Sequence, residues 1–200
     1  RFSYLFSEDN KSEIKKLSRQ FLNVTFLISV PCCCGIILVA DQIVEVLFGV
    51  EFLPAISTIR ILSILIVLMP LSGGVFCQLL LTAGKEKSYL ACVLIGTVVN
   101  TVLNYLLIPI FTQNGAAIAS VVAEFTVSIS MIVATRRTIK VNMCCRDVFS
   151  ILTSAFFMSL TLVLCHKLFS GQAVWMRLLV EIVIAVLVYF LCVFMLKNSA

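Results

Sequence analysis

The stretch NTVLNYLLIPIFTQNGAAIASVVAE, from Asn100 to Glu124, decides how this chain can fold. It belongs to a run without charged residues that extends from Ser88 to Ala123. One bilayer crossing needs about 20 apolar residues, so this run is long enough for two crossings. Pro109 disfavours continuation of a helix, and the polar residues 112–115 are typical of a turn. The sequence therefore predicts a tight hairpin of two membrane-spanning helices.

The first arm of this hairpin carries two amide side chains on one face. Asn100 and Asn104 are four residues apart, which places them one above the other on a helix. Two interpretations stay open for this pair. The amides either form hydrogen bonds to a neighbouring helix or line a polar cavity.

The second arm carries a polar stripe with an acidic residue at its centre. Ser120, Glu124 and Ser128 follow one another at four-residue spacing beside small side chains. Glu124 lies nine residues after Gly115, or about 13 Å along a helix, which is close to the middle of a bilayer. The stripe either packs closely against another helix or lines a water-filled path. The carboxylate favours the path, because an ionisable residue at that depth is a functional-site hypothesis by default.

The composition identifies an integral membrane protein. Of 200 residues, 61% are hydrophobic and 12% charged, whereas about a quarter of the residues in a soluble domain are charged. The chain has a single histidine and its nine cysteines form no CxxC pair, so neither a metal site nor a disulfide framework is indicated. No nucleophile with a base, no pair of catalytic carboxylates and no glycine-rich phosphate loop is visible. We therefore expect no enzyme, no catalytic residue and no cofactor.

The basic residues predict the topology. Twelve of the 15 Lys and Arg residues fall on one side of the predicted spans, and only Arg60, Lys167 and Arg177 fall on the other. This bias places both termini in the cytoplasm and argues against nucleic acid as a partner. Arg60 stands at an outer helix end, where it either anchors the interface or faces a cavity from outside. Arg177 and Glu181, four residues apart, are expected to form a local pair at the outer interface.

The chain is expected to form one membrane domain, 1–200, that is a bundle of six transmembrane helices. Residues 1–19 are expected to form a cytoplasmic basic helix on anionic lipid, with a headgroup-binding site as the alternative, and residues 41–56 an outer interfacial segment. Pro70 and the Gly73-Gly74 pair favour a bent or broken second crossing. The predicted spans are residues 20–40, 61–83, 89–111, 115–135, 148–165 and 178–196.

Several motifs resemble a known family over residues 1–140. They are VLFGVEFLPAISTIRIL at 46–62, LLLTAGKEKS at 79–88 and VVNTVLNYLLIPIFTQNGAAIAS at 98–120. Together they are similar to the C-terminal half of the polysaccharide biosynthesis flippases, in the multidrug/oligosaccharidyl-lipid/polysaccharide exporter superfamily. One departure is that Thr112-Gln113 fills a place where this family usually has an additional glycine before Gly-Ala-Ala.

The resemblance implies half of a two-bundle exporter in the bacterial cytoplasmic membrane. Such a protein would flip undecaprenyl-pyrophosphate-linked oligosaccharide for O-antigen (lipopolysaccharide) or capsule synthesis, by ion-coupled alternating access. Because the chain opens on Arg1, we expect a segment whose partner is the missing N-terminal half. The candidate substrate or ion pathway is Glu124, Asn100, Asn104, Ser120, Ser128 and Arg60.

Three other functions remain as alternatives, and one of them, a membrane partner that transports nothing, is excluded by no sequence feature. A cation-coupled multidrug exporter of the same superfamily would also use an intramembrane acid. A membrane polysaccharide polymerase or glycosyltransferase would need a large outer loop or a soluble domain, and the longest uncertain outer segment here is residues 41–60.

Overall fold

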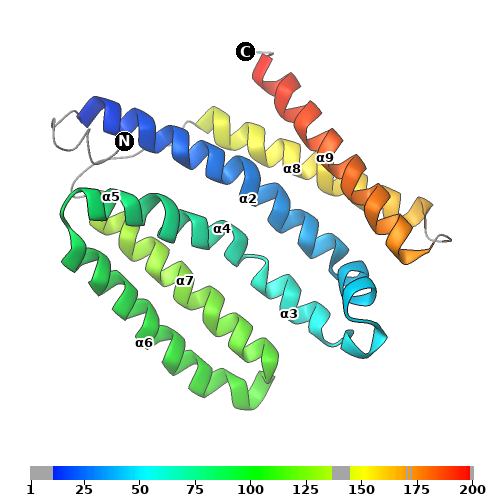
Figure 1. Cartoon of the computed structure of the whole chain (residues 1–200), viewed down its shortest axis with the longest axis horizontal. Coiled ribbons are helices and arrows are strands. Elements are labelled where there is room, and N and C mark those ends of the chain that lie inside the picture. The colour runs from blue at the N-terminus through cyan, green and yellow to red at the C-terminus, as the bar shows by residue number, and fades with distance from the viewer. Residues whose placement is uncertain (1–10, 137–144, 170, 172, 199–200) are drawn as a thin grey trace. The chain divides into compact units, whose positions relative to one another are not determined.

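A computed structural model describes residues 11–136, 145–169, 171 and 173–198, and helices dominate this part of the chain (Figure 1). Among the described residues, six helical spans are long and apolar enough to cross a membrane. This confirms the predicted all-α membrane protein with six spans. The elements are α2 (Lys11–Leu47), η1 (Val50–Phe52), α3 (Ala55–Leu62), α4 (Leu65–Met69), the π-helix η2 (Pro70–Phe76), α5 (Cys77–Thr82), α6 (Glu86–Phe111), α7 (Gln113–Arg136), α8 (Cys145–Leu168) and α9 (Val174–Asn198).

The described residues divide into two compact units, where the sequence analysis expects one domain. Unit 1 contains the start of α2, up to Phe26, and α4 to α7. Unit 2 contains the rest of α2 together with η1, α3, α8 and α9. Helix α2 runs without interruption through the division between them.

Helix α2 differs from the prediction at both of its ends. Residues 11–19 of the expected interfacial helix, the span at 20–40 and the first part of the expected segment at 41–56 are one helix over residues 11–47. Residues 1–10 of the expected interfacial helix lie outside the described residues. The reason at the N-terminal end is packing. Ile14, Ser18 and Leu22 are all buried at four-residue spacing, and Ile14 and Leu22 belong to the apolar core of unit 1. The first turns of α2 are therefore part of the folded core of that unit.

The second span is irregular, as Pro70 and the glycine pair predict. Helix α4 ends at Met69, and the π-helix η2 follows before α5 completes the span. Pro70 takes the first position of η2, where its missing N–H is tolerated. The irregular turn buries Ser72, Val75 and Phe76 in unit 1.

Helices α6 and α7 form the predicted hairpin, but the turn is shorter than expected. Helix α6 continues through Pro109 to Phe111, and Thr112 alone makes the reversal, with φ at 50°. Residues 113–115, expected in the turn, form the first turn of α7. A Cβ atom at Gly115 would overlap the backbone carbonyl of Leu107, so the hairpin needs a glycine there for close packing of α6 and α7.

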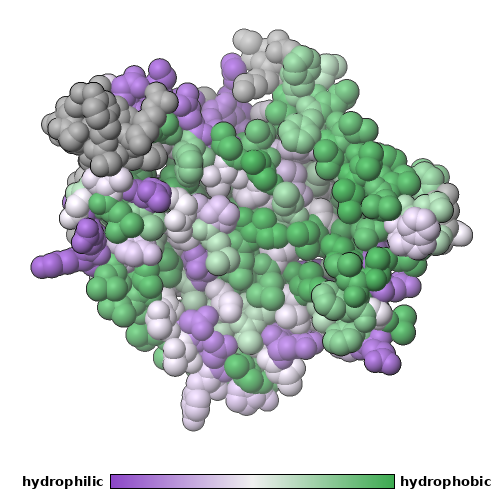
Figure 2. Space-filling model, viewed as in Figure 1, coloured by the Kyte–Doolittle hydropathy of each residue, from purple (hydrophilic) through white to green (hydrophobic). Residues whose placement is uncertain are grey.

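In unit 2, the hairpin of α8 and α9 packs on the second half of α2. The core is formed by Val39 from α2, Ala155, Met158 and Leu162 from α8, and Ala185 and Tyr189 from α9. The outer face of α9 is apolar, as Figure 2 shows by the hydrophobic side chains gathered over this helix. Exposed apolar side chains on a membrane-spanning helix are expected to contact lipid.

Candidate functional site

Unit 1 contains a polar groove between α4, η2, α6 and α7, with a volume of about 560 Å³. Apolar side chains such as Leu65, Val93 and Val127 form part of its wall. The groove is otherwise lined by hydroxyl, amide and carboxyl groups. Its polar lining residues are Ser72, Tyr89, Thr97, Asn100, Thr101, Ser120 and Glu124.

Glu124 is held in this groove by a hydrogen bond from the irregular turn. The hydroxyl of Ser72 donates to Oε1 of Glu124. The same hydroxyl lies 3.1 Å from the carbonyl oxygen of Leu68 in the preceding turn. A serine has only one hydroxyl proton, so Ser72 can donate either to its own backbone or to the carboxylate. Ser72 is therefore the partner of Glu124, a contact that the sequence alone does not reveal.

The position of Glu124 gives this contact its significance. Helix α7 runs from Gln113 to Arg136, so Glu124 is the twelfth of its 24 residues. A carboxylate at the centre of a membrane-spanning helix has few hydrogen-bond donors available, because hydrocarbon provides none. Ser72 supplies a donor, and the groove provides a polar opening beside it.

Two further predicted residues line the same groove. Asn100 lies on α6, and its Oδ1 accepts a hydrogen bond of 2.6 Å from Nδ2 of Asn104. Asn104 lies one turn further along α6. It is not a lining residue of the groove, but it donates a hydrogen bond to Asn100, which is one. On α7, Ser120 lines the groove while its hydroxyl donates to the carbonyl of Ala116 at 2.9 Å. The groove therefore joins Glu124, Asn100 and Ser120.

The other two predicted residues lie elsewhere. Ser128 is 2% exposed and is not part of the groove wall, so the polar stripe on α7 ends with Glu124 on the groove side. Arg60 belongs to unit 2, where its Nε donates to the carbonyl oxygen of Ile37 at 3.1 Å. The six predicted residues thus do not form a single site within one unit.

Four polar residues that line the groove of unit 1 are not among the predicted site residues. Thr97 and Thr101 each donate to the backbone one turn earlier, which is the normal behaviour of threonine in a membrane helix. Tyr89 lies near the start of α6. Ser72 was the one with a readable signal, because it stands between Pro70 and the glycine pair that predict the broken helix.

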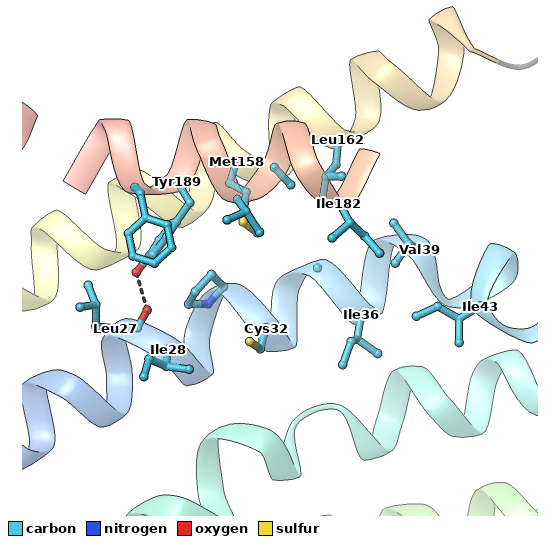
Figure 3. Close-up of a pocket in the computed structure, with 15 residues that line it drawn as sticks. Leu27, Ile28, Cys32, Ile36, Val39, Ile43, Met158, Leu162, Ile182 and Tyr189 are labelled. Carbon is cyan, nitrogen blue, oxygen red and sulfur yellow. Dashed lines mark hydrogen bonds between the residues drawn. The ribbon is translucent and has the colours of Figure 1, made fainter. Parts of the chain in front are cut away.

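Unit 2 contains a groove of opposite character. It lies between α2, α8 and α9, has a volume of about 370 Å³, and no charged residue lines it (Figure 3). Ile28, Ile36 and Ile43 contribute from α2, and Met158 and Ile182 from the α8–α9 hairpin. The hydroxyl of Tyr189 donates to the carbonyl oxygen of Leu27 at 2.8 Å. With this hydroxyl satisfied, the groove offers an entirely apolar surface.

Six membrane spans, a broken helix and a polar groove with a carboxylate at mid-membrane depth are typical of a membrane transporter. The model of the family "Lipid II flippase MurJ" matches residues 1–191, so the chain belongs to that family. A search among curated proteins finds no match.

The chain is also similar in structure to a solved protein described as "Lipid II flippase MurJ, inward closed conformation". The TM-score is 0.78 at 13% sequence identity, with 99% of this chain and 42% of that chain covered. This likeness supports the fold. The chain spans less than half the length of the solved flippase.

Family membership settles the broad predictions. The chain is a multi-pass protein of the cytoplasmic membrane in a family of lipid-linked flippases, within the exporter superfamily to which the motifs point, and this is not a family of enzymes. The matching family is named for lipid II, whereas the motifs suggest the polysaccharide biosynthesis branch. The O-antigen or capsule cargo, the orientation of the termini and the missing half therefore stay predictions.

Proposed function

We propose that the complete protein flips a polyprenyl-pyrophosphate-linked saccharide across the cytoplasmic membrane by alternating access, and that its cargo is of the lipid II type. The family match supports the reaction class and the cargo. An O-antigen or capsule precursor shares the lipid and the pyrophosphate, and it is the competing cargo. A multidrug exporter is disfavoured because the matching family is named for a lipid-linked substrate.

The groove of unit 1 is proposed to carry the coupling cation. The observation behind this assignment is the carboxylate of Glu124, which lines the groove with Asn100 and Ser120. A pyrophosphate next to Glu124 would meet like charge, at a cost of about 4 kcal/mol per charge pair at 4 Å and an effective dielectric constant of about 20. The negative charge of Glu124 instead attracts a proton or a small hard cation. Carboxylate, amide and hydroxyl oxygens are also the ligands that such cations prefer.

The apolar groove of unit 2 is proposed to hold part of the polyprenyl tail. Its walls bear no charge and its single hydroxyl is occupied by Leu27. An isoprenoid chain entering this groove would need no compensating hydrogen bond. Cations that neutralise the pyrophosphate are then expected from the part of the transporter that lies outside this chain.

Flipping by the complete protein in proteoliposomes tests the cargo. Lipid II and an O-antigen-type lipid-linked oligosaccharide, with the same polyprenyl chain, should be compared at equal concentration. We expect faster flipping of lipid II. Equal or faster flipping of the oligosaccharide would reject the lipid II assignment, and no flipping of either would reject the proposed function.

A further inference from the structure

Unit 2 contains a second, charged pocket that the proposed transport does not use. It has a volume of about 190 Å³ and is lined by residues near the C-terminal ends of α2, α3 and α8, together with Glu181 of α9. Its floor is apolar, from Leu38, Val39, Leu162 and Val163. Its charged and polar lining residues are Asp41, Arg60, His166, Lys167 and Glu181.

One wall of this pocket is fixed by a buried hydrogen-bond network. The amide Nε2 of Gln42 donates to Oε2 of Glu181 at 2.7 Å and lies 2.9 Å from Nδ1 of His166. Gln42 is 0% and Glu181 1% exposed. The expected pair with Arg177 is present, with its Nε 3.8 Å from Oε1 of Glu181. The charge of Glu181 is thus balanced within the protein.

The same network determines what His166 can offer a ligand. An amide NH₂ group is a donor, so Nδ1 of His166 accepts and its proton is carried on Nε2. The histidine side chain is 41% exposed. It therefore presents one N–H donor that Gln42 does not occupy.

The other charged residues of the pocket, Arg60, Lys167 and Asp41, form no ion pair with one another in the part of the chain that the structure describes. Arg60 uses Nε for the carbonyl of Ile37, which leaves the donors on its terminal nitrogens, and Lys167 is exposed. Asp41 carries the opposite charge to Arg60 and Lys167. Its Oδ1 is buried and accepts no hydrogen bond within the part of the chain that the structure describes. A buried acceptor without a donor is costly, and Asp41 lines the pocket, so its carboxylate favours a ligand that carries a donor.

We propose that this pocket binds the headgroup of phosphatidylethanolamine. Arg60 and Lys167, with the N–H of His166, match the phosphodiester, and Asp41 matches the primary ammonium. The site lies at the correct depth, because Lys167 is one residue before the end of α8 and helix ends mark the membrane interface. The carboxylate of Asp41, unpaired among the described residues, disfavours a ligand with negative charges alone, such as the pyrophosphate of the cargo.

Headgroup specificity separates this proposal from general lipid binding. Phosphatidylglycerol has the phosphodiester without the ammonium, and phosphatidylcholine has a quaternary ammonium that cannot donate to Oδ1 of Asp41. A hydrogen bond between charged groups corresponds to a factor of about ten in affinity. Phosphatidylethanolamine should therefore bind about tenfold more tightly than either of these lipids.

Native mass spectrometry of the purified full chain with each lipid, matched in acyl chains, measures this preference. Asp41→Asn should lower phosphatidylethanolamine binding to the level of phosphatidylglycerol. Lys167→Gln, at an exposed position, should weaken the binding of both lipids severalfold, and Lys87→Gln serves as the control because Lys87 lies in unit 1. Thermal unfolding of each variant verifies folding.

Results of two kinds would overturn the proposal, one kind from the wild-type chain and the other from the variants. One is equal binding of the three lipids by the wild-type chain. The other is a phosphatidylethanolamine preference that survives in Asp41→Asn or binding that survives unchanged in Lys167→Gln. Because the measurement involves no flipping, its failure would leave the proposed transport function untouched.

Discussion

The two grooves of this chain differ in the polarity of their linings and in the regularity of the helices around them. In unit 1 the second span is broken by η2, and the irregular turn brings the hydroxyl of Ser72 to the carboxylate of Glu124. In unit 2 the groove is walled by the regular helices α2, α8 and α9 and carries no charged residue. The irregular span therefore adds the hydrogen-bond partner of Glu124 to a groove whose other polar lining residues lie on α6 and α7.

The largest expected effect is the loss of transport in Glu124→Gln. This substitution keeps the shape of the side chain and removes its charge. If the groove carries a cation, flipping should fall on the order of a hundredfold, because a hydrogen-bonded charge contributes about 3 kcal/mol. Membrane insertion and abundance should stay normal. Glu86→Gln, at the exposed first residue of α6, is the matched control and should transport normally.

A structural role for Glu124 predicts the opposite outcome. Glutamine can still accept from Ser72, so a carboxylate that only joins two helices should tolerate the substitution. Normal flipping by Glu124→Gln would therefore remove the functional difference between the two grooves.

The next effect concerns the hairpin that carries the polar groove. In Gly115→Ala the new methyl group meets the Leu107 carbonyl, which is backbone and cannot rotate away. Overpacking of this kind costs about 2 kcal/mol. The melting temperature in detergent should fall by several degrees. Gly35→Ala in α2, where no atom lies within 4 Å of the added carbon, should be neutral or slightly stabilising, and equal effects at both positions would contradict the close packing.

Ser72→Ala should have a smaller effect on transport. It removes the donor to Glu124 but leaves the carboxylate and the groove in place. The loss of one hydrogen bond corresponds to about 1 kcal/mol, or roughly fivefold slower flipping. Ser18→Ala, which also removes a buried hydroxyl in unit 1, is the matched control. Equal flipping rates in the two variants would show that the contact with Glu124 has no special role.

The smallest effect is expected in the apolar groove. Tyr189→Phe removes the hydrogen bond to the Leu27 carbonyl and leaves the ring in the core of unit 2. Thermal unfolding should show a loss of about 1 kcal/mol or less. Cation dependence of transport should be unchanged. A change in cation dependence would mean that the apolar groove contributes to coupling and would weaken the contrast with unit 1.

The sequence predicts the fold better than it predicts the site. Charge-free runs and the Pro70-Gly73-Gly74 pattern are local signals, and they correctly gave the hairpin and the broken span. The continuity of α2 was not predictable, because burial of Ile14 and Leu22 in unit 1 depends on residues distant in the chain.

The same limit applies to the functional residues. Four-residue spacing groups Ser120, Glu124 and Ser128, of which Ser120 and Glu124 line the groove and Ser128 does not. It could not show that Ser72, 52 positions away, is the partner of the carboxylate. The pocket around Asp41 and His166 likewise joins residues from four separate helices, and no local pattern marks it.

The central claim is that the groove of unit 1 couples transport to a cation through Glu124. The most direct measurement is the rate of lipid II flipping by the complete protein in liposomes with an imposed proton or sodium gradient. The wild-type rate should rise with one of these gradients, and the Glu124→Gln rate should stay low and independent of both. A Glu124→Gln protein whose flipping still responds to the gradient as the wild type does would contradict the account.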